Sequence, residues 1–330
     1  MAMKETIPFK CVDVEPVRAQ ITAAGEGVIR ATKLLYRAPF GGENRYYFTD
    51  THKFFFAGYS VWTSKLIPKG PQFIEWLRRS GAEGQEYALE RREYGSAFHH
   101  VVAEMERDVE RKFSFDAPAE WVKDILKMYT TSAGLVFEVA FEKWWRWLKN
   151  DMYAWLSFKK EHNVRVLACE LPVFDEKFCI ASPADIVCLM QYKKKETFAI
   201  IDIKATDKPI GDNLEYKLQL AFLKYAYNFL YAGQTGEVQT TFNWSLMDRG
   251  KSPGKYRITE QGFDEEFTFD LFIKYASLCA DLKLNVPSGY ITNFIDGEDG
   301  PEMIRIKPAD WLKEFQKLIN SRNNKKTRKK

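Results

Sequence analysis

The chain has 330 residues, of which 45% are hydrophobic, 15% aromatic and 28% charged. This composition is typical of a packed globular protein and excludes a chain that is disordered over most of its length. Lys and Arg number 49 against 45 Asp and Glu, but the last ten residues, SRNNKKTRKK, carry six positive charges and no negative charge. Without them the balance is 43 against 45, a net charge of −2. The basic character therefore belongs to a tail over residues 321–330, which we expect to be solvated.

Cysteine usage and the N-terminal composition favour an intracellular protein, cytoplasmic or nucleoid-associated. The five cysteines are odd in number and contain no CxxC spacing, so they indicate neither a disulfide framework nor a zinc site. The first residues have neither the apolar core of a secretion signal nor the acid-poor composition of a transit peptide. No apolar run approaches the roughly 18–20 residues that a membrane span requires, and we expect no membrane association.

The first half of the chain combines a short β-rich segment with a longer helical one. Over residues 1–65, the stretches LLYRAPF and RYYFT predict two strands around a Gly-Gly turn. Over residues 66–162 the pattern is helical, with an amphipathic stretch over 83–112 and an aromatic-rich stretch over 133–162. We expect this helical segment to form a wall or an arch beside the core.

Residues 163–290 are expected to hold the core. VRVLACELPVF, FCIASPADIVCLM and TFAIIDI are apolar and are separated by the short polar stretches DEK and YKKKE, so they predict a three-stranded antiparallel meander. A helix over about 214–231, the strand TTFNWSLM with a hairpin partner, and a helix over about 264–284 follow. A C-terminal helical region is expected over residues 291–320.

Both faces of the predicted meander are apolar, which is typical of strands in the middle of a covered sheet. Strict alternation places Ile180 and Ile186 on one face, and Ala181 and Val187 on the other. The predicted fold class is therefore α/β (α+β): a central mixed β-sheet that contains the antiparallel meander and is flanked by helices.

Four polar residues interrupt these apolar strands: Glu170, Asp185, Asp202 and Lys204. Opposed residues of an antiparallel hairpin have a constant sum of residue numbers. If Asp185 faces Asp202, the turn is centred inside YKKKE; if Glu170 faces Asp185, the turn is centred at the edge of DEK. The sequence therefore predicts three carboxylates side by side, with opposed Cβ atoms about 4.5–5.5 Å apart. Alternation puts Lys204 on the face of Asp202, with Ile203 in the core.

Three carboxylates this close cannot all remain ionised without a cation. Hard oxygen ligands suit Mg²⁺ or Mn²⁺, and a metal beside an ammonium group fits phosphodiester hydrolysis. The alternative is an exposed sheet face on which Asp202 and Lys204 form a surface pair. The apolar neighbours of all four residues disfavour it, although a one-residue slip at either turn would break the alignment.

The same residues resemble the signature of the PD-(D/E)xK nuclease superfamily, which implies a restriction-endonuclease-like core. The PAD stretch at 183–185 matches the first half of that signature with one residue inserted, and the DIK stretch at 202–204 matches the second. Gln219 matches the glutamine of the RecB-like branch, and the GSAFH stretch at 95–99 is similar to its G-x-x-x-H element. The order of the motifs is most similar to the mitochondrial genome maintenance exonuclease type.

For the metal, this resemblance implies Asp185 and Asp202 as ligands, with the carbonyl of Ile203 as a further oxygen. Glu170 would bind the metal directly or through water, and His99 would be a further ligand or a water contact. The implied cofactor is Mg²⁺ or Mn²⁺. No iron–sulfur cluster is expected, because relatives that hold one have three cysteines after the core and this chain has one there.

For catalysis, the resemblance implies that Lys204 is the catalytic lysine and acts with the two aspartates. Gln219 would position Lys204 or the scissile phosphate and so contact DNA. Thr206 and Lys208 would contact the DNA backbone.

The function implied is a Mg²⁺- or Mn²⁺-dependent deoxyribonuclease, an exonuclease acting on single-stranded DNA or on free DNA ends. A role in DNA repair or recombination would follow. Two alternatives remain open: a site-specific or structure-specific endonuclease of the same superfamily, and a catalytically idle nuclease-derived protein that binds DNA.

Overall fold

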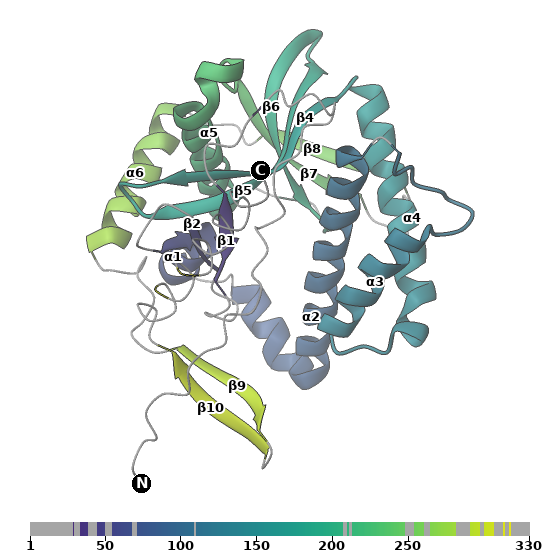
Figure 1. Ribbon diagram of the computed structural model, residues 1–330. Helices are drawn as coiled ribbons and strands as arrows, with labels where there is room; N and C mark the ends of the chain where they lie inside the picture. Colours follow the sequence, from purple (N-terminus) through teal and green to yellow (C-terminus); the bar gives the residue numbers. More distant parts are fainter. Residues whose placement is uncertain are drawn as a thin grey trace, which may run out of the picture.

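A computed structural model shows how the chain folds (Figure 1). It describes residues 29, 34–38, 45–49, 55–67, 71–108, 110–206, 210, 213–247, 254–260, 265–281, 291–297, 300–306, 313 and 317. The elements, in chain order, are β1 (Leu35–Arg37), β2 (Tyr46–Thr49), β3 (Phe56–Gly58), α1 (Tyr59–Leu66), α2 (Pro71–Arg107), α3 (Glu120–Ser132), α4 (Phe137–Glu161), β4 (Arg165–Asp175), β5 (Ile180–Tyr192), β6 (Lys195–Lys204), α5 (Leu214–Thr235), β7 (Thr240–Leu246), β8 (Tyr256–Glu260), α6 (Glu265–Asp281), β9 (Ile291–Gly297) and β10 (Gly300–Ile306).

Strands β1 to β8 form one mixed sheet, in the order β1-β2-β3-β5-β6-β7-β8 with β4 paired to β5. The predicted β4-β5-β6 meander is confirmed, and so is the antiparallel β1–β2 pair. Two pairs are parallel, β3 with β5 and β6 with β7. Because β4 runs along one edge of β5, the other edge is shared by β3 at Ile180 and by β6 from Ile186 on.

Helices cover the sheet on both sides, with α5 and α6 on one side and α2, α3 and α4 on the other (Figure 1). The α4-side core includes Phe98, Trp144, Trp155, Ile186, Ile201, Phe242 and Trp244. The α5-side core includes Ile180, Val187, Ile200, Leu220, Phe222 and Phe272. The predicted fold class, a mixed sheet flanked by helices, is therefore confirmed. No helix among the described residues is long and apolar enough to cross a membrane.

The predicted division of β5 between the two faces is wrong. Ile180 packs in the α5-side core and Ile186 in the α4-side core, although their spacing is even. On β5 the exchange occurs at Asp185, between Ala184 and Ile186, and on β4 it occurs at the opposed residue Glu170, which has φ +50. A residue in the left-handed region breaks strand alternation, so the side chains exchange faces at this point.

Two elements differ from their predicted form. The helical stretches after Pro71 join into α2, with one non-helical residue, Gly81 at φ 56. Residues 291–306, predicted as part of a helical region, form the antiparallel hairpin β9–β10. The sequence at 296–300, Asp-Gly-Glu-Asp-Gly, is rich in the residues that favour hairpin turns and break helices. The remaining domain boundaries stay predictions, and the basic tail lies outside the described residues.

Candidate active site

The two hairpin registers bring the predicted acidic residues to adjacent positions. Tyr192 pairs with Lys195 and Ile186 with Ile201, so the next pair along the strands is Asp185 with Asp202. In the other hairpin, Leu171 pairs with Ala184 and Cys169 with Ile186, which leaves Glu170 opposite Asp185. Both turns are centred where the sequence predicts them, because the short polar connections leave little freedom for a slip.

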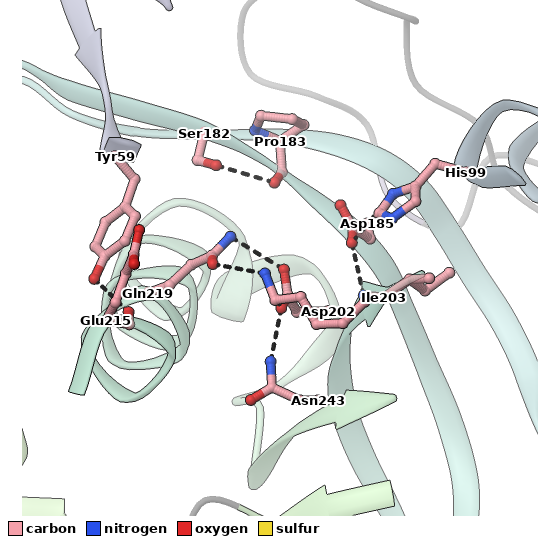
Figure 2. Close-up of polar contacts among 11 residues, drawn as sticks. Tyr59, His99, Ser182, Pro183, Asp185, Asp202, Ile203, Glu215, Gln219 and Asn243 are labelled. Atoms are coloured by element: carbon pink, nitrogen blue, oxygen red, sulfur yellow. Dashed lines mark hydrogen bonds and ion pairs between the residues drawn. The ribbon is translucent and has the colours of Figure 1, made fainter. Parts of the chain in front are cut away.

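Three possible metal ligands converge on the α2 side of this meeting point. His99 on α2, Glu170 on β4 and Asp185 on β5 each offer one ligand atom, and these atoms lie within 4.8 Å of one another. His99 Nδ1 is 3.5 Å from Asp185 Oδ2 (Figure 2). The same oxygen accepts a hydrogen bond from the backbone N–H of Ile203 at 2.7 Å, which ties the group to β6. We call His99, Glu170 and Asp185 the ligand triad.

Asp202 is not part of the ligand triad, although it lies next to it; its side chain is on the α5 side of β6. Its Oδ2 accepts from Lys204 Nζ and from Asn243 Nδ2, both at 2.7 Å, and its Oδ1 accepts from Gln219 Nε2 at 3.0 Å (Figure 2). Lys204 Nζ also donates to Gln219 Oε1 at 3.0 Å. Asp202 is only 2% exposed, so these donors take the place of water around its carboxylate. We call Asp202, Lys204, Gln219 and Asn243 the lysine clamp.

Burial sets the electrostatics of the lysine clamp. It raises the pKa of Asp202, while the neighbouring Lys204 acts in the opposite direction. For Lys204, burial is the largest single influence and acts to lower the pKa, but the charge and hydrogen bond of Asp202, together with Tyr216 and Asp185, hold the pKa above its ordinary value. Lys204 is therefore a cation at neutral pH, suited to stabilising negative charge and not to accepting a proton. Its Nζ also lies 4.6 Å from the centroid of the Tyr216 ring.

The remaining predicted site residues lie at the end of β6 or beyond it. The N–H of Thr206 donates to the carbonyl of Lys204 at 2.6 Å, so Thr206 follows the lysine closely. Lys208 lies outside the described residues. The DNA contacts predicted for both residues stay predictions, as do the roles of the metal ligands.

Asn243 is the residue of this site that the sequence reasoning missed. It lies on β7, directly beside Asp202 in the parallel β6–β7 register, and is fully buried. A signal was present: Asn243 is polar within the otherwise largely apolar strand TTFNWSLM, the same feature that singled out the carboxylates. The parallel pairing that brings it to Asp202 could not be derived from turn positions, because a helical crossover separates the two strands.

Carboxylates on β4 and β5, an imidazole on α2 and a lysine on β6 together fit a metal-dependent phosphodiesterase site. Two carboxylates and an imidazole in one group suit a divalent cation such as Mg²⁺ or Mn²⁺. The sequence model of the PD-(D/E)XK nuclease superfamily matches residues 73–288, more than half of the chain. The chain therefore belongs to the PD-(D/E)XK nuclease superfamily, whose members are nucleases that use divalent metals. No curated protein shows significant similarity to it.

Proposed function

We propose that this chain is a Mg²⁺- or Mn²⁺-dependent deoxyribonuclease of the RecB-like branch, most similar to the mitochondrial genome maintenance exonuclease type. It acts as an exonuclease on single-stranded DNA or on free DNA ends, in repair or recombination. The observation that carries the proposal is the ligand triad standing next to the lysine clamp. Two branch-specific features support it: the histidine of the G-x-x-x-H element belongs to the triad, and the glutamine contacts both Asp202 and Lys204.

Each group has a part in this mechanism. His99, Glu170 and Asp185 would hold the cation, with Asp202 and the Ile203 carbonyl as further ligands. A divalent cation bound there polarises the scissile phosphate and makes water more acidic. The Lys204 ammonium offsets the negative charge that develops on the phosphate. Gln219, hydrogen-bonded to both Lys204 and Asp202, keeps the ammonium in place.

Removing one carboxylate of the ligand triad tests the proposal. We expect Asp185→Asn and Glu170→Gln to lower cleavage of end-labelled oligonucleotides in Mg²⁺ or Mn²⁺ by more than about 100-fold, because each loses a charged ligand. Glu196→Gln is the matched control, since Glu196 is an exposed carboxylate of the same meander, on β6. Chelation should abolish wild-type activity, and added Mg²⁺ or Mn²⁺ should restore it.

Assays on different DNA substrates distinguish an exonuclease from an endonuclease. Single- and double-stranded oligonucleotides labelled separately at each end show polarity and strand preference. Closed circular single-stranded DNA should resist the enzyme, because an exonuclease requires an end. Cutting of the circle would instead support an endonuclease, and binding without cleavage in both metals would support an idle DNA-binding protein. Full activity of both triad variants would contradict the assigned site.

A further inference from the structure

Asn243 is held in a fully buried position on a central strand. On β7 its neighbours Phe242 and Trp244 point into the α4-side core, so Asn243 points to the other face, toward α5. β7 is hydrogen-bonded to β6 on one edge and to β8 on the other. A buried amide at such a rigid position is costly unless it is hydrogen-bonded, and here its Nδ2 donates to Asp202 Oδ2 at 2.7 Å.

The three donors to Asp202 differ in how firmly they are held. Lys204 reaches the carboxylate on a long flexible side chain, and Gln219 comes from helix α5. Asn243 has a short side chain on the strand next to that of Asp202, in direct register with it. Of the three donors, the Asn243 amide is therefore the one with the least conformational freedom relative to the Asp202 carboxylate.

We propose that Asn243 is a positioning residue of the active site, which orients the Asp202 carboxylate for both the cation and Lys204. The proposal rests on the proposed nuclease function and extends it to a residue on β7. Asn243 is fully buried and its amide contacts the Asp202 carboxylate, so in this proposal it acts on the reaction through that carboxylate.

Two substitutions that keep the side chain branched at Cγ test this role. Asn243→Leu removes the donor, and Asn243→Asp also places a second carboxylate against Asp202. Thr241→Val is the matched control: Thr241 is 3% exposed, lies two residues earlier on the same face of β7, and pairs with Ile200, away from the site. For all four full-length proteins, thermal unfolding, Mn²⁺ affinity by calorimetry without DNA, and kcat and KM for DNA with Mn²⁺ would be measured.

We expect both Asn243 variants to remain folded at the assay temperature. We expect kcat and Mn²⁺ affinity to fall by about 10- to 100-fold, as is usual for partners that orient metal ligands, with the larger loss in Asn243→Asp. KM for DNA should stay within about twofold, and Thr241→Val should match the wild type. A structural role alone would lower the unfolding temperature and leave kcat and Mn²⁺ affinity unchanged, which would overturn the proposal. A parallel rise of KM would overturn it too, because it would indicate a DNA contact.

Two variants are used because either one could fail to fold. The Mn²⁺ titration is used because it tests the positioning role even if the protein does not cleave DNA. If one Asn243 variant fails to fold, the other decides the outcome. If the wild type binds Mn²⁺ but cleaves no DNA, the proposed function fails. The effect of Asn243 on Mn²⁺ affinity still supports the positioning role if it is present, and overturns it if it is absent.

Discussion

At the scale of single residues, the backbone of Glu170 shapes the site. Its φ of +50 lies in a region that non-glycine residues seldom adopt, and such conformations cost about 1–3 kcal/mol and concentrate at functional sites. The break in alternation occurs where Glu170 meets Asp185. As a result, these two carboxylates join His99 on α2, while Asp202 faces α5 and takes part in the lysine clamp.

The Lys204 ammonium is expected to be needed for turnover but not for metal binding. Lys204→Gln should lower kcat by about 100- to 1,000-fold, because the reaction loses a partly buried cation that is already oriented by Asp202 and Gln219. Mn²⁺ affinity should be retained, since the ligand triad keeps all its groups. Lys224→Gln on α5 serves as the control, because the Lys224 ammonium donates to the backbone carbonyl of Gln239, the residue just before β7. Single-turnover cleavage and calorimetry would measure the two effects; an unchanged kcat would remove Lys204 from the mechanism.

At the scale of elements, the placement of α2 decides whether His99 reaches the carboxylates. Glu90 and Glu106 lie on either side of His99 along α2, are both largely buried, and accept from the indole N–H groups of Trp144 and Trp155 on α4, each at 3.0 Å. These hydrogen bonds hold α2 against α4 on both sides of His99. Between them, α2 passes close to the end of β6.

Gly95 lies where α2 approaches the end of β6, and a small and a large substitution there should affect activity differently. A Cβ at Gly95 would stand 3.4 Å from the Cβ of Ala205, an ordinary contact. Gly95→Ala should therefore keep its activity and gain about 0.5–1 kcal/mol of stability from helix propensity. Gly95→Leu should displace α2 and with it His99, and lower cleavage by about 100-fold.

Thermal unfolding and cleavage assays on the two Gly95 variants would measure these effects. Equal activity of the leucine and alanine variants would show that the helix does not need its close approach to β6.

At the scale of the whole molecule, net charge is a poor guide to the substrate. The chain without its tail has a net charge of −2, which by itself does not suggest a DNA-binding protein. The ligand triad nevertheless contributes two carboxylates, and a bound divalent cation reverses the local sign of charge. The field inside the site, not the total charge, is what a phosphate meets.

The basic tail, residues 321–330, is expected to contribute salt-dependent affinity for DNA. Truncation after Asn320 removes six positive charges. It should weaken binding of single-stranded DNA more at low salt than at high salt, and reduce the slope of log affinity against log salt by up to about 4. Fluorescence anisotropy over a salt series would measure this. Turnover at saturating DNA should not change, and an equal loss of kcat would indicate that the tail acts at the site itself.

The sequence alone determined the meander, its registers and the neighbourhood of Glu170, Asp185 and Asp202. It could do so because short polar turns and strand alternation are local constraints, and a hairpin joined by a tight turn has one register that buries its apolar residues. Gln219 was singled out by its match to the family signature, and in the structure its side chain contacts Asp202 and Lys204.

The division of these side chains into the ligand triad and the lysine clamp could not be predicted from the sequence and is seen in the folded chain. The left-handed turn of the backbone at Glu170, the approach of His99 on α2 and the parallel pairing that brings Asn243 to Asp202 have no local signature. Each depends on contacts between segments far apart in the chain, which packing of helices and strands against a common core selects. The strands could thus be aligned from residue numbers, whereas the separation of the ligand triad from the lysine clamp required the folded molecule.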